Sequence, residues 1–419
     1  SHYLICKNGK AEVSRYWKLS YFPKFSAKTA AQERELEAEL LDRLEQAVKI
    51  RLISDVPLGA FLSGGMDSSA VVALMSRIMR EPVRTFSIGF DEEEYDELRY
   101  AKIVAGRFKT DHTELRIKPN AVDILPKLVW HYNEPFADSS AIPSYYVAKL
   151  AREHVTVVLN GDGGDESFAG YDRYAINELV HRFDIIPSFI RRILFPLIAS
   201  AVPLTSNPNG FLRRLKKFSE ALALSPELRY AAWLCYFDNE MKSVLYTDDF
   251  KVKTQEVDSF DIILARYAEA EADNLTERTL YADVSLYLPD TLLVKMDVAS
   301  MANSLEARSP FLDHKLMEFV ARIPTNLKLN NGRTKIILKN AFQGILPSDI
   351  IVRKKMGFAV PLDHWFRNEL KEIAYDTLLG RRCIERGYFN KLFILRILDE
   401  HTSGKRNWHH HIYSLLMLE

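Results

Sequence analysis

One short stretch combines the residue types that bind a polyphosphate. LSGGMDSS begins at Leu62 and lies between an apolar run and a probable helix. Its glycines, Gly64 and Gly65, would let the backbone approach a ligand, and the free N–H groups of the helix would attract an anion. The carboxylate of Asp67 would repel phosphate, which points to a bridging Mg²⁺ ion. Simple helix capping by Asp67 or Ser68 is the alternative.

A second stretch could supply further metal ligands. LNGDGGDESFAGYDRY, residues 159–174, follows a β-branched run and carries Asp162, Asp165 and Glu166 among glycines. If both runs are strands of one parallel sheet, both loops lie at the same edge and could share a Mg²⁺ site. A solvated acidic turn is the alternative.

Two basic or mixed stretches are harder to interpret from local physics. Lys335 and Lys339 in NGRTKIILKNAF would share one face of a helix, which an exposed basic surface would equally explain. The region DTLLVKMDVASMANSLEARSPFLDH could form a buried ion network or line a substrate pocket. Its charged residues of interest are Lys295, Asp297, Glu306, Arg308 and Asp313.

The surrounding elements indicate an α/β fold. From Thr29, strong helix formers carry apolar residues at Leu36, Leu40, Leu44 and Val48, which is typical of an amphipathic helix. Short apolar or β-rich runs then alternate with helical patterns as far as about Ala175, which predicts a parallel sheet covered by helices on both faces. Beyond that residue the strand signals fade.

We therefore predict three parts. Residues 1–28 are expected to be an irregular lead-in, residues 29–175 an α/β domain, and residues 176–419 a mainly helical region that completes the site.

Composition excludes several function classes. The 56 basic and 56 acidic side chains of this 419-residue chain balance, so nothing favours a nucleic-acid partner. The longest apolar run, near Ile193–Leu204, is interrupted by prolines and too short to span a membrane. Three scattered cysteines and the lack of a signal-peptide pattern lead us to expect a cytoplasmic protein.

Taken together, these motifs resemble a known family. LSGGMDSS is similar to the pyrophosphate-binding loop of the N-type ATP pyrophosphatases. Further stretches resemble the synthetase part of glutamine-hydrolysing asparagine synthetases. They are EPFADSSAIPSYYVA, NGDGGDESFAGYDRY, SMANSLEARSPFLDH and RKKMGFAVPLDHWFR, in the family's order from about residue 50 to residue 370.

The resemblance implies a fold, a chemistry and cofactors. The fold would be an adenine nucleotide alpha-hydrolase-like (HUP) domain followed by helices. A carboxylate such as that of aspartate would attack the α-phosphate of ATP, with Mg²⁺, and ammonia would then displace AMP from the acyl-adenylate. Other implied partners are a glutaminase domain in the full-length chain and, as an open question, a second copy in a homodimer.

The resemblance also assigns residues to roles. Ser63, Gly64, Gly65, Asp67 and Ser68 would hold pyrophosphate and Mg²⁺, with Asp165 as a second metal-linked carboxylate. Lys335 would neutralise charge on the leaving pyrophosphate, and Asp162 would take a proton from the attacking amine. Nucleotide contacts would come from Leu62, Ser87, Ile88 and Gly161. Substrate contacts would come from Asp165, Glu166, Arg308 and Asp313.

Two features depart from the family pattern. The chain begins SHYLICK, and Cys6 does not match the N-terminal cysteine nucleophile of the glutaminase. We therefore expect that this sequence is a trimmed piece of a longer chain and does not hydrolyse glutamine. Asn160 replaces the serine common before the acidic loop, which changes a contact near the nucleotide but no charge.

Two alternatives to aspartate adenylation remain open at this stage. The same chemistry could act on another carboxylate, such as a cell-envelope or peptide substrate, because small pocket changes can switch the acceptor. A non-catalytic nucleotide-binding scaffold is the alternative from another class, although Asp67, Asp165 and Lys335 are all present.

Overall fold

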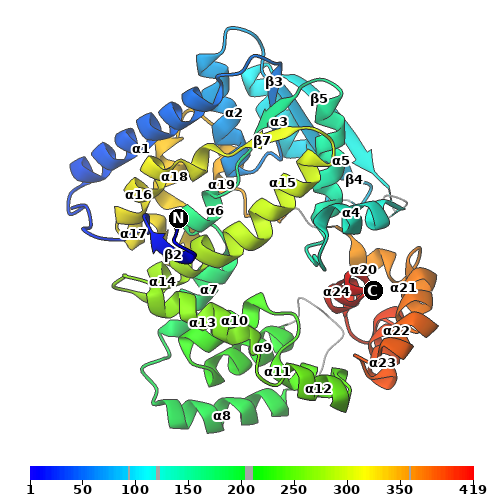
Figure 1. The fold of residues 1–419 in the computed structure, drawn as a ribbon. Coiled ribbons are helices and arrows are strands. Elements are labelled where there is room, and N and C mark those ends of the chain that lie inside the picture. Colours follow the sequence, from blue (N-terminus) through cyan, green and yellow to red (C-terminus); the bar gives the residue numbers. More distant parts are fainter. Residues whose placement is uncertain (93–94, 119–122, 203–210, 358–359) are drawn as a thin grey trace.

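The structure, a computed structural model that describes residues 1–92, 95–118, 123–202, 211–357 and 360–419, contains a five-stranded parallel sheet. The strand order is β5-β4-β3-β6-β7, and each neighbouring pair is parallel. Figure 1 shows this sheet in the upper part of the molecule, with helices α8 to α13 below it and α20 to α24 at one side. The predicted α/β fold with a helical C-terminal region is confirmed.

The bounds of the elements are as follows. The strands are β1 His2–Lys7, β2 Lys10–Arg15, β3 Leu58–Phe61, β4 Arg84–Phe90, β5 Asp111–Ile117, β6 Val157–Leu159, β7 Glu306–Arg308, β8 Leu329–Asn330 and β9 Arg333–Thr334. The helices in the first part are α1 Ala30–Arg51, α2 Met66–Ile78, α3 Leu98–Phe108, α4 Leu125–Tyr132, α5 Ala141–Arg152, α6 Gly164–Phe168 and α7 Asp172–His181.

Most later elements are helices. They are α8 Ser188–Ala201, α9 Phe211–Ala223, α10 Pro226–Leu234, α11 Asn239–Leu245, α12 Asp248–Thr254, α13 Ser259–Glu269, α14 Leu275–Ala282, a π-helical segment Asp283–Leu293, α15 Val294–Met301, a 3₁₀ turn Pro310–Leu312, α16 His314–Arg322, α17 Thr325–Lys328, α18 Ile336–Ala341, α19 Ser348–Val352, α20 Leu362–Trp365, α21 Lys371–Leu378, α22 Arg381–Arg386, α23 Lys391–Thr402 and α24 His409–Leu418. Among the described residues, each helix is too short or too polar to cross a bilayer.

Helices cover both faces of the sheet, as the alternation of strand side chains requires. On β3 and just after it, Ala60 and Leu62 pack in the core shared with α1, α2 and α3. Phe61, between them, packs in the opposite core, which includes residues of α4, α5 and α15. Because successive side chains of a strand point to opposite faces, the sheet has two buried faces and its polar groups collect at its ends.

The first long helix follows its sequence pattern closely. Thr29 caps α1 by accepting a hydrogen bond from the backbone N–H of Gln32. The four apolar positions that predicted the helix are all buried, namely Leu36, Leu40, Leu44 and Val48.

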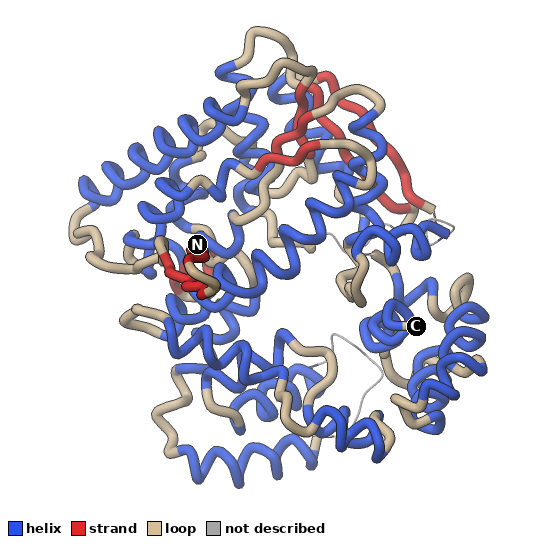
Figure 2. Tube along the Cα trace, in the orientation of Figure 1, coloured by secondary structure: helices blue, strands red, loops and turns tan. Residues whose placement is uncertain are grey.

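The N-terminal segment differs from the predicted irregular lead-in. β1 and β2 pair as an antiparallel hairpin, visible near the N-terminus in Figure 2 as strands separate from the main sheet. Leu19 and Tyr21 are then buried in a core shared with helices α7, α10, α13 and α14. Asn8 and Gly9 both have positive φ at the hairpin turn, and this Asn-Gly pair was the sequence signal for a hairpin that the prediction overlooked.

The boundary predicted near residue 175 does not separate the sheet from later residues. β7, at Glu306–Arg308, pairs with β6 and forms the edge of the sheet. This strand has only a few residues and one partner, so its sequence carried little strand signal.

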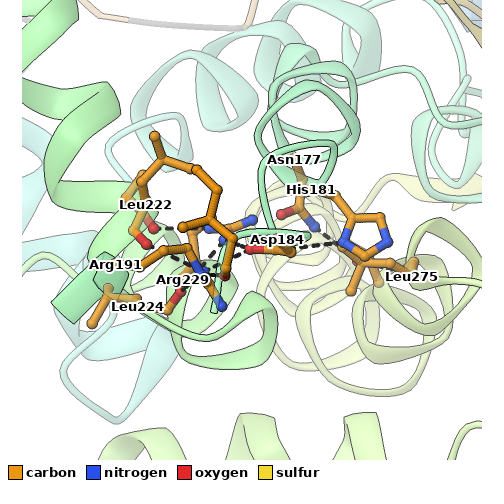
Figure 3. A network of polar contacts seen from close by, with 11 residues as sticks. Asn177, His181, Asp184, Arg191, Leu222, Leu224, Arg229 and Leu275 are labelled. Atoms are coloured by element: carbon orange, nitrogen blue, oxygen red, sulfur yellow. Dashed lines mark hydrogen bonds and ion pairs between the residues drawn. The ribbon is translucent and has the colours of Figure 1, made fainter. Parts of the chain in front are cut away.

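A largely buried ion cluster joins helices α8 and α10. Figure 3 shows Asp184 with Arg191 of α8 and Arg229 of α10 on one side and His181 on the other. The Asp184 carboxylate lies 2.7 Å from Arg191 and 2.8 Å from Arg229, and it also accepts a hydrogen bond from His181. Burial opposes ionisation, but these partners lower the pKa of Asp184 below its ordinary value.

Removing this charge is expected to destabilise the protein. Asp184→Asn would leave two largely buried guanidinium groups without their counter-charge, which costs about 3–5 kcal/mol of unfolding free energy. Urea unfolding would measure the loss. The matched control is Asp248→Asn, because Asp248 forms an ion pair on the surface and its replacement should leave the unfolding midpoint unchanged. Equal midpoints for both variants would contradict the structural role of Asp184.

Candidate active site

A cavity of about 390 Å³ opens at the carboxyl ends of β3, β4 and β6. This is the edge where ligands bind in parallel α/β sheets. Most of the predicted site residues line it: Leu62, Ser63, Gly65, Asp67, Ser68, Ser87, Ile88, Gly161, Asp162, Asp165, Glu166 and Lys335.

The first loop connects β3 to α2 and is held in a compact turn. Gly64 has φ of +69°, and a Cβ atom there would lie 2.4 Å from the backbone of Tyr100, so glycine is required on both grounds. Gly64 shapes the loop without lining the cavity. The Ser63 and Ser68 hydroxyls lie 3.0 Å apart, and the N–H of Gly65 donates to the Ser63 hydroxyl. The loop thus presents hydroxyls and the start of α2 to the cavity.

The second loop follows β6 and packs directly on the first. A Cβ atom on Gly161 would lie 2.8 Å from both Asp67 Cβ and the backbone nitrogen of Ser68. The predicted juxtaposition of the two loops is therefore present in the structure. Asn160 Nδ2 donates to Asp162 at 2.8 Å, so the residue that departs from the family pattern orients the neighbouring carboxylate.

Two lysines from the helical region neutralise the two loops. Lys335 Nζ lies 2.5 Å from Asp67 Oδ2 and 2.7 Å from Asp165 Oδ1. Lys355 Nζ lies 2.6 Å from the other carboxylate oxygen of Asp165. Lys335 thus bridges the first and the second loop, and Lys355 binds the second loop alone.

The electrostatics of the cluster distinguish its carboxylates. Burial raises the pKa of Asp67, although Lys335 opposes this shift. Asp165 is buried as well, but Lys335 and Lys355 together hold its pKa well below the ordinary value. Burial also raises the pKa of Asp162, which is partly countered by Lys295 and Lys355. Asp162 is therefore a stronger base than an exposed aspartate.

The predicted helix with two lysines on one face requires correction. α18 begins at Ile336, and Lys335 precedes it in a left-handed conformation with φ of +53°. This conformation is unusual for a residue with a side chain, and here the Lys335 side chain enters the acidic cluster. A simple helical pattern could not predict it.

The residues to which the family resemblance assigns nucleotide contacts lie on the sheet side of the cavity. The Ser87 hydroxyl donates to the carbonyl of Leu62, which ties β4 to the residue after β3. Ile88 and Phe61 provide apolar surface in the same part of the lining. Such a mixture of apolar surface with a few oriented polar groups is typical of ligand pockets.

A second group of charged residues also lines the cavity. Lys295 of α15 lies 3.3 Å from Asp138 and donates to the Ser140 hydroxyl at 2.8 Å. Asp138 also accepts hydrogen bonds from the backbone and side chain of Ser140. The sequence left open whether Lys295 belongs to a buried ion network or lines a pocket, and in the structure its side chain both pairs with Asp138 and lines the cavity.

Other lining residues had no assigned role in the sequence analysis. Asp138 and Ser140 lie within the EPFADSS motif, and Lys355 within RKKMGF, so those motifs were the available signal. Tyr287 comes from the π-helical segment, which has no recognisable sequence signature.

Two predicted substrate residues do not reach the cavity. Arg308 pairs with Glu306 and donates to the carbonyls of Arg51 and Ile53, each at 2.8 Å. Asp313 caps α16 and pairs with Arg51 at 3.2 Å. These side chains hold the end of α1 against β7 and α16, so the substrate contacts expected of Arg308 and Asp313 are corrected to structural contacts.

The donor set fits a magnesium–nucleotide complex better than a metal bound by protein alone. Within the described residues, no group of three or more His, Cys, Asp or Glu side chains could enclose a metal ion. Mg²⁺ is usually held by one or two carboxylates together with substrate phosphates. Asp67 and Asp165 share one ammonium group, and the buried Asp67 Oδ1 has no hydrogen-bond partner within the described part of the chain. They therefore fit such a role.

Glu166 gives the site a pH-dependent contribution to stability. Burial and the neighbouring Asp165 raise its pKa to about 7, although the Tyr171 hydroxyl donates to it. Between the unfolded value near 4.5 and this folded value, only the native state keeps the proton. The unfolding free energy must therefore fall as the pH rises through this window.

The variant Glu166→Gln should remove this pH dependence, because glutamine is neutral throughout. From pH 4.5 to 7.5, the unfolding free energy of the unmodified protein is expected to fall more than that of the variant, by on the order of 3 kcal/mol. Urea titrations at several pH values would measure both profiles. Glu153→Gln, on the surface, is the control and should follow the unmodified protein. Parallel profiles for Glu166→Gln would contradict the assignment.

Comparison with known proteins identifies a family with the same sequence motifs. Residues 39–419 match the family described as asparagine synthase. The chain is 32% identical to asparagine synthetase [glutamine-hydrolyzing] 1 of Bacillus subtilis, over 100% of this chain and 63% of that protein. It is also 32% identical to a putative asparagine synthetase of Mycobacterium tuberculosis, over 97% of this chain and 60% of that protein.

A more distant relative carries a different name. Amidase chyE of Penicillium rubens is 28% identical, over 87% of this chain and 58% of that protein. The chain thus spans about three fifths of the length of the curated relatives it matches.

Two glycine-rich loops and Lys335 meet at the edge of the sheet, and residues 39–419 match the family model. The chain therefore belongs to the asparagine synthase family.

Proposed function

We propose that this chain is the synthetase part of an ATP-dependent, amide-forming ligase, with aspartate as the acceptor. The observation that carries the proposal is the cluster of Asp67, Asp165 and Lys335, which joins two loops of the sheet to the helical region. Each motif taken alone could have a purely structural role. A buried cluster of two carboxylates and a lysine beside a loop suited to anions favours phosphate chemistry.

In the first step, the aspartate β-carboxylate attacks the α-phosphorus of ATP and pyrophosphate leaves. Ser63, Ser68 and the N–H groups at the start of α2 would bind the pyrophosphate oxygens. Asp67 and Asp165 would hold Mg²⁺, which supplies charge neutralisation when bound with ATP. Lys335 would stabilise the negative charge that develops on the leaving pyrophosphate.

In the second step, ammonia attacks the acyl carbon of the adenylate and AMP leaves with the electrons of the broken C–O bond. The attacking nitrogen must lose a proton, and Asp162 would accept it. Its raised pKa and its hydrogen bond from Asn160 support this role.

The reaction products provide the direct test. Incubation of the 419-residue chain with ATP, Mg²⁺, aspartate and ammonium should give AMP, pyrophosphate and asparagine in equal amounts. Ammonium replaces glutamine because glutamine hydrolysis is proposed to belong to a glutaminase domain of the full-length chain. Formation of ADP and inorganic phosphate would contradict adenylation.

A second candidate keeps the chemistry and changes the acceptor carboxylate. The match to a relative named as an amidase, a name that specifies no aspartate acceptor, supports this candidate. A panel of carboxylic acids, including peptides, would be scored by pyrophosphate release. Higher kcat/KM for a larger acid than for aspartate would select this candidate.

A further inference from the structure

Helix α8 turns apolar side chains toward solvent. Figure 1 shows it along the lower edge of the molecule, with the other helices of the lower part between it and the sheet. Phe189 is 66% exposed, Ile193 64% and Leu197 63%, and their spacing of four residues aligns them along one side of the helix. Ile190 and Leu194 are exposed as well and widen this surface. We call these five residues the α8 stripe.

The other face of α8 packs within the protein. The buried Arg191 donates to the Asp184 carboxylate and to the carbonyl of Leu222 in α9. Ala199 is buried as well. Apart from two arginines and two serines, every residue of α8 is apolar. A helix that is apolar all round is normally covered on all sides, whereas a helix at an ordinary protein surface turns polar side chains outward. The α8 stripe therefore suits a further apolar environment.

The charge around the α8 stripe favours a negatively charged partner. Residues 185–202 contain no acidic residue. Arg192 is exposed, and it borders the stripe because it follows Phe189 by three positions on the helix. Asp184, just before α8, is already paired with two buried arginines. Helix α9 packs against α8, and its sequence begins FLRRLKKF, with four basic residues and no acidic one.

A second copy of the chain fits this surface less well than a lipid surface does. In a symmetric dimer the same patch meets itself, so the basic border of the α8 stripe would face an equally basic border. Like charges brought together in this way oppose association. An anionic lipid surface instead offers hydrocarbon to the stripe and phosphate groups to Arg192.

We propose that α8 lies flat on an anionic lipid surface, with the α8 stripe at the boundary between headgroups and hydrocarbon and Arg192 at the level of the phosphates. A helix of 14 residues lies along such a surface, because about 20 residues are needed to cross the hydrocarbon core. The proposed ligase chemistry plays no part in this argument.

Vesicle flotation tests the proposal directly. The 419-residue chain would be mixed with vesicles of phosphatidylcholine alone and with vesicles of equal parts phosphatidylcholine and phosphatidylglycerol. We expect binding to the anionic vesicles that weakens at high salt. Phe189→Gln combined with Ile193→Gln should weaken it about 10- to 100-fold, because two apolar side chains no longer leave water. Arg192→Glu should weaken it about 5- to 30-fold.

A matched control replaces apolar residues that are equally exposed elsewhere. Val252 on α12 is 65% exposed and Leu392 on α23 is 75% exposed, and glutamine at both positions should leave vesicle binding unchanged. The substituted residues in all these variants are exposed, so melting temperatures should stay the same. Pyrophosphate release in solution should also stay the same, because these residues are not among those that line the cavity.

Three results would overturn the assignment. The first is that the unmodified protein binds neither kind of vesicle. The second is that the Phe189→Gln, Ile193→Gln double variant binds anionic vesicles as well as the control does. The third is that light scattering finds a dimer that this double variant dissociates, without vesicle binding, which would make the α8 stripe an interface between copies. Loss of vesicle binding when a glutaminase domain is joined to the chain would likewise overturn it, since the stripe would then be a domain interface.

Discussion

Replacing Lys335 with alanine is expected to lower kcat/KM for ATP by about 10²–10³-fold, the effect of removing one preorganised group that stabilises transition-state charge. Lys335 Nζ contacts both Asp67 and Asp165, and its side chain is only 5% exposed. Because this position is buried, water cannot supply an equivalent fixed positive charge in the transition state. The loss should therefore appear mainly in kcat. Initial rates of pyrophosphate release at varied ATP concentrations would measure it.

The control for this variant should share its backbone conformation. Lys109 also has a left-handed conformation, with φ of +52° against +53° for Lys335, and it is exposed at the end of α3. Lys109→Ala should therefore retain full activity. We expect Lys335→Ala to remain folded by circular dichroism, because Asp165 keeps Lys355 as a partner and Asp67, whose pKa burial already raises, can take up a proton. A folded Lys335→Ala protein with unmodified rates would remove the proposed role.

The second large effect is expected at Asp67. Asp67→Asn keeps the volume of the side chain but loses its charge, and we expect kcat/KM to fall about 10²–10³-fold because metal-ion charge stabilisation is worth several kcal/mol. The Mg²⁺ concentration for half-maximal activity should rise as well. Lys335 keeps Asp165 as a partner, so the melting temperature should change little.

The magnesium dependence separates metal binding from general loss of function. Rates would be measured over a series of Mg²⁺ concentrations at fixed ATP for Asp67→Asn and for Asp111→Asn, an exposed aspartate at the start of β5. Asp111→Asn should match the unmodified protein throughout. If Asp67→Asn lost activity with an unchanged Mg²⁺ requirement, its role as a metal ligand would be wrong.

Elements with a regular side-chain period were predictable from the sequence. The buried positions of α1 repeat every four residues, and the core strands β3, β4 and β6 are short apolar or β-branched runs. These patterns arise because each helix or strand buries one or both of its faces, so they can be recognised within the element's own sequence. The hairpin β1–β2 and the edge strand β7 lack such a pattern, since the hairpin is exposed on both faces and β7 is very short.

The sequence by itself determined the class of fold, the two glycine-rich loops and the family. Only the tertiary structure decided which charges meet. It placed Lys335, far along the chain, between Asp67 and Asp165, brought Lys355 to the same carboxylate, and turned Arg308 and Asp313 toward α1. The physical reason is that local patterns report burial and backbone preference, whereas the partner of a charged side chain depends on how distant segments pack.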